Sequence, residues 1–158
     1  MQGEPWRYTV CMNSIGMHAL APVPLANIPV GLPLIGTSVH AGFPSPAEDY
    51  MEQRIDLNAI LITHPQASFI FRVAGESMRE FGIGDGDMLL VNRAIKPCHG
   101  HIVIAVVDGE YAVKQLYTRG GRIKLKAGNP TYPEIVPIEG QTVEVWGVAT
   151  SCIKQFQR

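Results

Sequence analysis

Short hydrophobic runs recur along the second half of the chain, and glycines or other turn residues separate them. The runs have the length and the content of β-branched residues that are typical of strands. The run at residues 102–107 is apolar throughout, as expected for a strand buried on both faces. We predict strands at residues 69–74, 88–92, 102–107, 111–117, 122–126 and 143–149, with a further strand running to residue 153.

Turn residues indicate how several of these strands connect. Asp108-Gly109 predicts a tight hairpin, and Gly120-Gly121 predicts another reversal of the chain. Asp56 can cap a short helix over residues 56–62, which Pro65 would end. Many short strands with glycine-bearing turns indicate a mostly β fold, either a sandwich or a partly open barrel.

The first 47 residues follow no such pattern. From Tyr8 to Ala47, forty successive residues carry no Asp, Glu, Lys or Arg, and seven of the 12 prolines lie in the first 46 residues. Proline favours extended backbone. We therefore divide the chain into an extended, flexible, Pro-rich arm at residues 1–47 and a charged, β-rich domain at residues 48–158.

Composition narrows the classes of function. The 158 residues carry 13 basic and 14 acidic side chains, and a net charge of −1 argues against a globally basic nucleic-acid binder. Prolines interrupt the apolar stretches of the arm, so we expect neither a membrane-spanning helix nor a secretory signal. Cys11, Cys98 and Cys152 make no disulfide framework and fit a reducing cytoplasm.

Ser77 and Lys114 are the main candidates for chemistry. Ser77 follows a predicted strand and Gly75, which allows a sharp turn at the mouth of the sheet, although a serine here is also a common helix cap. Strand alternation places Lys114 on one face with Ala112 and Leu116. If that face is buried, the pKa of the lysine falls and its neutral amine can act as a base; if it is exposed, the side chain reaches solvent.

Other candidate sites are weaker. Cys98-His99-Gly100-His101 holds its ligands too close together for a tetrahedral metal site, and we expect a polar loop with a small buried thiol. Asp85 and Asp87 alternate with glycines as in a turn and lack the spacing of an EF-hand. The pattern predicts neither a metal nor a cofactor. The segment Val39–Pro44 offers a small, accessible Ala41–Gly42 bond, but it can equally be an ordinary loop.

Together, the serine, the lysine and this segment resemble the LexA/UmuD family of self-cleaving serine proteases, and most closely its UmuD branch. The similar stretches cover most of residues 41–148 in the order of the family. They are AGFPSPAEDYMEQRIDLN (41–58), FRVAGESM (71–78), GIGDGDMLLV (82–91), HGHIVIAVVDGEYAVKQL (99–116) and VEVWGV (143–148).

The resemblance implies a fold and a set of roles. The fold would be the β fold of the LexA/UmuD C-terminal domain, which bacterial signal peptidases share. Ser77 would be the nucleophile, Lys114 the general base and Ala41–Gly42 the scissile bond. Backbone N–H groups of Glu76 and Ser77 would hold the oxyanion.

The resemblance also implies partners and a setting. A RecA filament on single-stranded DNA would stimulate self-cleavage as part of the SOS response to DNA damage. The product, residues 42–158, would be the accessory subunit of an error-prone, UmuC-like Y-family translesion polymerase. A cytoplasmic homodimer is expected, with cleavage within or between protomers. Residues 1–40 are too short and too Pro-rich for the helix-turn-helix domain of LexA, so no direct sequence-specific DNA binding is expected.

The sequence departs from the UmuD branch in one respect, and it is also compatible with two other functions. The arm before Ala41 is longer than usual, which a start at Met12 or Met17, or an added segment, would explain. A non-catalytic β-barrel binding module is one alternative, because Arg122, Lys124 and Lys126 share a strand face that could meet phosphate; a solvated edge strand explains them as well. A Ser/Lys protease acting in trans, like a signal peptidase, is the other, but the arm supplies no membrane anchor for it.

Overall fold

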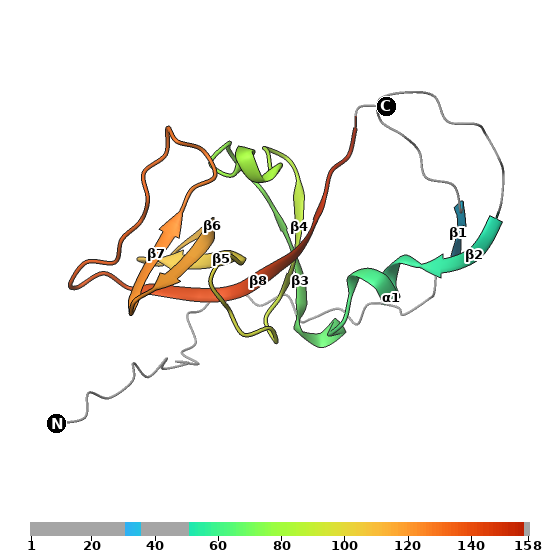
Figure 1. Ribbon diagram of the computed structural model, residues 1–158, viewed down its shortest axis with the longest axis horizontal. Helices are drawn as coiled ribbons and strands as arrows, with labels where there is room; N and C mark the ends of the chain where they lie inside the picture. Colours follow the sequence, from blue (N-terminus) through green and yellow to red (C-terminus); the bar gives the residue numbers. More distant parts are fainter. Residues whose placement is uncertain (1–30, 36–50, 157–158) are drawn as a thin grey trace.

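β-Strands make up most of the regular structure in the computed structural model, which describes residues 31–35 and 51–156 (Figure 1). Two short strands lead into a helix of one turn: β1 (Gly31–Ile35), β2 (Met51–Asp56) and α1 (Leu57–Leu61). Two 3-10 turns follow, η1 (Pro65–Ala67) and η2 (Arg79–Phe81). The remaining strands are β3 (Ser68–Arg72), β4 (Met88–Asn92), β5 (Ile102–Val107), β6 (Glu110–Arg119), β7 (Arg122–Lys126) and β8 (Val143–Ile153).

These strands form two antiparallel sheets. One pairs β1 with β2, and the other has six strands in the order β3-β4-β8-β5-β6-β7. The hairpins β5-β6 and β6-β7 turn at Asp108-Gly109 and Gly120-Gly121, as the sequence predicts. The mostly β fold is therefore confirmed. Within the described residues, no helix has the length and apolar character needed to cross a membrane.

The six-stranded sheet buries side chains on both of its faces. Along β5, Ile104 joins one buried cluster, whereas its neighbours Val103 and Ala105 join another. This alternation confirms that the apolar run of β5 is covered on two sides. The first cluster comprises Val73, Met78, Ile83, Leu89, Val91 and Ile104, and the second comprises Val103, Ala105, Leu116, Leu125 and Val148.

β8 is one continuous strand of 11 residues, although its sequence predicts two. Against β5, Ile104 pairs with Gly147 and Ala105 with Val145, which leaves Trp146 as an extra residue. Against β4, the register shifts again around Thr150. Irregularities of this kind bend a strand and increase its twist. β8 can therefore continue through the bend instead of ending at it.

The sheet curls strongly between β3 and β6. In a flat sheet of this strand order, β3 and β6 would be four inter-strand spacings, or about 19 Å, apart. Residues that end β3 and residues of β6 nevertheless line the same cleft. The sequence left a sandwich and a partly open barrel as alternatives, and the curl of this sheet favours the partly open barrel.

The segment before the main sheet differs partly from expectation. Asp56 caps α1 by accepting a hydrogen bond from the backbone N–H of Asn58 at 3.0 Å, as predicted. The arm is predicted to be extended and flexible, with no regular strand, whereas its residues Gly31–Ile35 form β1 and pair antiparallel with β2. Figure 1 shows β1, β2 and α1 beside the six-stranded sheet and not within it.

Candidate active site

The loop that carries Ser77 is held by the turn that leads into β4. Just past the end of β3, the backbone N–H of Val73 donates to the carbonyl of Asp87 at 2.8 Å. Gly75 has a φ of +88°, so the chain turns sharply at the position that the sequence predicts. The N–H of Gly75 then donates to the Asp85 carboxylate at 2.7 Å. The backbone immediately before Ser77 is thus fixed on one side.

A second turn, after β7, holds the same loop from its other side. The side-chain amide of Asn129 donates to the carbonyl of Glu76 at 3.0 Å, and the N–H of Glu80 donates to the carbonyl of Gly128 at 2.7 Å. Met78 is buried, with 1% of its surface exposed, and anchors the loop in the core. Ser77 therefore lies on a backbone that is fixed both before and after it.

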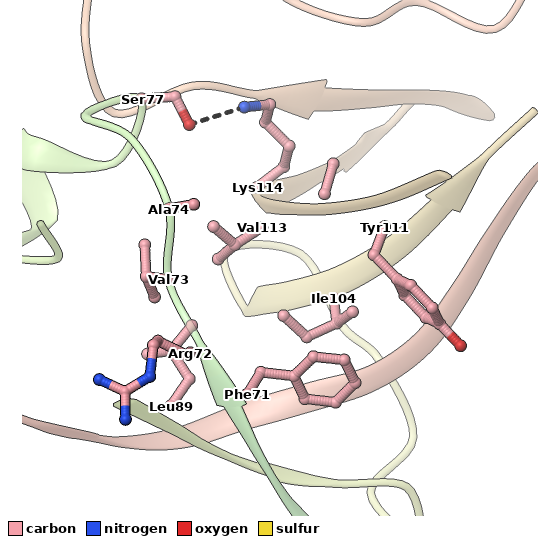
Figure 2. A pocket seen from close by; sticks show the side chains of 11 residues that line it. Phe71, Arg72, Val73, Ala74, Ser77, Leu89, Ile104, Tyr111, Val113 and Lys114 are labelled. Carbon is pink, nitrogen blue, oxygen red and sulfur yellow. Dashed lines mark hydrogen bonds between the residues drawn. The ribbon is translucent and has the colours of Figure 1, made fainter. Parts of the chain in front are cut away.

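Ser77 and Lys114 meet directly. Lys114 extends from β6, and its Nζ donates a hydrogen bond to Ser77 Oγ at 2.9 Å (Figure 2). The lysine is half-buried, and this desolvation lowers the pKa of its amine from the ordinary value of 10.5. The alternative of a helix cap is excluded for Ser77, because η2 has Met78 at its N-cap and no side-chain cap bond.

The pair lies at one end of a cleft of about 300 Å³. In Figure 2, Ser77 and Lys114 lie together at the top, and the rings of Phe71 and Tyr111 lie at the far end, beyond Ile104. The cleft follows the seam between the end of β3 and the start of β6. Its lining residues are Phe71, Arg72, Val73, Ala74, Ser77, Leu89, Ile104, Tyr111, Ala112, Val113 and Lys114.

The backbone N–H groups of Glu76 and Ser77 are available as donors. Neither of them donates to an acceptor within the part of the chain that the structure describes. Such N–H groups beside a nucleophile can stabilise negative charge on a reacting carbonyl oxygen. The arrangement therefore combines a hydroxyl and a lysine with a lowered pKa in one cleft, next to backbone donors of the serine loop.

The other residues that the sequence singles out do not line the cleft of Ser77 and Lys114, or lie outside the described residues. Ala41 and Gly42 lie outside the described residues. Asp85 and Asp87 form the expected turn; Asp87 is buried and pairs with Lys154 at 2.6 Å, which helps to lower the pKa of its carboxyl group. The prediction of a buried thiol in the 98–101 loop was wrong, because Cys98 is exposed. That loop instead closes by a bond from the N–H of Cys98 to His101 Nδ1.

Sequence reasoning missed three residues that support the serine loop: Asp85, Gly128 and Asn129. Gly128-Asn129-Pro130 is recognisable as a turn. Nothing in the sequence, however, connects it with a serine loop that lies 53 residues away. The role of Asp85 was equally hidden, because its partner is a backbone N–H and leaves no sequence pattern.

Comparisons with known proteins identify the family. The chain matches the family described as Peptidase S24-like over residues 33–150. The chain belongs to this family. The chain is also 46% identical over 121 residues to protein SamA of Salmonella typhimurium, and this match covers 77% of the chain and 84% of SamA.

The chain is also similar to two further relatives. It is 38% identical over 120 residues to protein MucA of Escherichia coli, covering 75% of this chain and 82% of MucA. It is 37% identical over 125 residues to the LexA repressor of Shewanella woodyi, covering 78% of this chain but 60% of the repressor. The chain is thus a UmuD-like member of the LexA/UmuD family, a self-cleaving serine protease related to the SOS response.

Proposed function

We propose that Ser77 and Lys114 form the catalytic dyad that cleaves the chain's own Ala41–Gly42 bond. The 2.9 Å contact between Lys114 Nζ and Ser77 Oγ carries this proposal. A serine hydroxyl becomes a nucleophile when a nearby base removes its proton. Partial burial favours the neutral form of Lys114, which is the form that can accept that proton.

The reaction follows from this pair. Neutral Lys114 takes the proton of Ser77, and Oγ attacks the carbonyl carbon of Ala41. The backbone N–H groups of Glu76 and Ser77 stabilise the resulting oxyanion. The C–N bond then breaks, and the Lys114 ammonium gives its proton to the departing amine of Gly42. A water molecule, deprotonated by Lys114, hydrolyses the Ala41–Ser77 ester and restores the serine hydroxyl.

Two unpaired strand edges flank the cleft and suit an extended substrate. β3 is the outermost strand of its sheet, so its outer edge has no partner strand among the residues that the structure describes. β7 pairs only with Gln115–Arg119 of β6, which leaves the outer edge of residues 110–114 without β7 beside it. An extended segment can add to such an edge through backbone hydrogen bonds. Small residues such as Ala41 and Gly42 let the backbone approach Ser77 closely.

Tethering makes high affinity for the arm unnecessary. A substrate that belongs to the same chain is present at a high effective concentration. Control then depends on how often the arm occupies the cleft, and a partner that favours the occupied state raises the rate. The uncharged, Pro-rich composition before Glu48 supports the division that this control requires, an arm at residues 1–47 and a peptidase domain at residues 48–158.

The biological setting is part of the same proposal. The similarity to SamA, MucA and LexA supports a role in the SOS response. We propose that a RecA filament on single-stranded DNA stimulates cleavage in the cytoplasm. Residues 42–158 then act, as a homodimer, as the accessory subunit of a UmuC-like Y-family translesion polymerase.

Mass spectrometry of the purified chain at alkaline pH tests the dyad. Wild-type protein should yield two fragments, 1–41 and 42–158, whereas Ser77→Ala and Lys114→Ala should stay intact. Gly42→Glu should also stay intact, because a large charged side chain next to the scissile bond cannot fit. Circular dichroism checks that each variant is folded. A cut after Ala41 that persists in a folded Ser77→Ala or Lys114→Ala protein would overturn the assignment.

A further inference from the structure

The β6–β7 hairpin presents an outward face that the proposed protease function does not use. Directly opposite pairs share one face of a hairpin, and here these pairs are Arg119 with Arg122, Tyr117 with Lys124, and Gln115 with Lys126. The opposite side of the hairpin carries the buried Leu116 and Leu125. We call the outward set Arg119, Arg122, Lys124 and Lys126 the basic face.

Positive charge is concentrated here against the trend of the whole chain. Residues 115–126 contain four of the 13 basic side chains and none of the 14 acidic ones. The rest of the chain therefore has nine basic and 14 acidic side chains, a net charge of −5. A globally neutral protein thus carries a local positive field over one hairpin.

Folding does not account for this arrangement. Arg119 and Arg122 lie directly opposite each other, and like charges in that position destabilise a sheet. Within the described residues, neither arginine has an acidic group within 4.0 Å. Lys124 and Lys126 share a single carboxylate, Glu134, at 3.1 and 3.5 Å. The face therefore keeps uncompensated positive charge, and its two arginines are exposed.

The face lacks the apolar anchor that a protein partner usually needs. Its one aromatic ring, Tyr117, is covered by Lys126 at 4.9 Å and Lys124 at 5.8 Å, and His99 packs against it edge-on. Protein interfaces depend on buried aromatic or aliphatic residues at their centre. A polyanion with regularly spaced charges, in contrast, can bind to evenly spaced cationic side chains without such an anchor.

We propose that the basic face binds the phosphate backbone of single-stranded nucleic acid. Arg122, Lys124 and Lys126 follow one another along β7 at intervals of about 7 Å, because alternate residues of a strand face the same way. This spacing resembles that of successive phosphates along an extended single strand. β7 is also the outermost strand of the sheet, but its outer edge is bridged to Ile135 at Leu125, so we expect the nucleic acid to contact the side chains of the basic face and not the strand edge. The net charge of −5 elsewhere disfavours the wider, more highly charged duplex.

The binding should be weak, independent of sequence and strongly salt-dependent. Four phosphate contacts to a single strand predict a slope of about −3 in a plot of log affinity against log salt concentration. Glu134 competes with phosphate for both lysines, so its removal should strengthen binding. The face lies outside the cleft, so self-cleavage should not depend on it.

Fluorescence anisotropy with a labelled oligothymidylate tests the proposal on the full chain. Arg122→Glu and Arg119→Glu should each weaken binding roughly fivefold to tenfold and flatten the salt slope. Arg54→Glu, at an exposed position of β2, makes the same change in net charge and should leave binding nearly unchanged. Glu134→Gln should strengthen binding severalfold, whereas Glu144→Gln on β8 should not.

Several results would overturn the proposal. Equal losses in Arg122→Glu and Arg54→Glu would mean that only net charge matters. Displacement of the oligonucleotide by polyglutamate at equal charge concentration would indicate an acidic protein partner instead, and tighter binding of a duplex would exclude a single-strand site. The arginine variants should still cleave themselves at the wild-type rate, so a failure of the nucleic-acid proposal can be told apart from a failure of the protease assignment.

Discussion

Lys114 must be buried enough to lose its proton and close enough to Ser77 to receive another. Half-burial lowers the pKa of its amine from 10.5, and its Nζ lies 2.9 Å from Ser77 Oγ. In the ammonium form the lysine donates in this bond, and in the neutral form its nitrogen can accept the proton of the serine hydroxyl. The rate of self-cleavage should therefore rise about tenfold per pH unit below the pKa of the lysine and level off below pH 10.5. A pH–rate profile followed by mass spectrometry measures this, and a flat profile from pH 6 to 10 would contradict it.

The same burial should affect stability with a definite sign. A lysine whose folded-state pKa is below its unfolded-state value binds fewer protons when the chain is folded, so stability rises as pH climbs from the lowered value towards 10.5. Lys114→Met removes the desolvated ammonium and keeps its volume. We expect Lys114→Met to melt at a higher temperature than wild type at pH 7, with the difference shrinking at alkaline pH. A variant that melts lower at pH 7 would show that the bond to Ser77 outweighs desolvation.

Asp85 should position the nucleophile without touching the substrate. Its carboxylate accepts the N–H of Gly75 at 2.7 Å, two residues before Ser77. Asp85→Ala removes this acceptor, and we expect self-cleavage to slow roughly tenfold as the serine loop loses its fixed place. Asp85→Asn keeps an oxygen at the same position and should retain most of the rate. Equal loss in both variants, with unchanged melting temperatures, would point to the charge of Asp85 and not to its hydrogen bond.

Gly147 allows β8 and β4 to pack closely at the centre of the curled sheet. A Cβ at this position would lie 2.8 Å from Val91 Cγ1 and 3.4 Å from the carbonyl oxygen of Asn92. Val91 is fully buried and has little room to move. Gly147→Ala should therefore lower the free energy of unfolding by about 1–3 kcal/mol, measured by urea denaturation. Gly31→Ala is the matched control, since its nearest neighbour would be 4.0 Å away.

Elements with a strong local pattern could be predicted, and those that depend on distant partners could not. β4, β5 and β7 have the predicted bounds, because apolar runs between turn residues define them. β1 and β2 were both missed, because their pairing depends on contact across 15 intervening residues. The continuity of β8 was missed as well, because its irregular pairing arises only against β4 and β5.

Across the whole molecule, the candidate site depends on the curl of the sheet. Ser77 follows one edge strand and Lys114 lies on a strand four positions away, so no local segment contains both. The sequence reveals the two residues by their individual settings and by resemblance, but their 2.9 Å approach is a property of the complete fold. The hydrogen bonds by which Asp85 and Asn129 hold the serine loop also form only in the complete fold.

Loss of the first 41 residues should leave the main sheet intact. Neither β1 nor β2 pairs with a strand of the six-stranded sheet, and both buried clusters lie within residues 71–149. We expect a 42–158 chain to melt within ~3 °C of full-length Ser77→Ala, whose arm cannot be removed. Hydrogen exchange should show unchanged protection in β4, β5 and β8 and faster exchange in β2, which loses its partner β1. A fall in melting temperature of more than ~10 °C, or lost protection in β5, would mean that the arm is part of the folded core and not a removable segment.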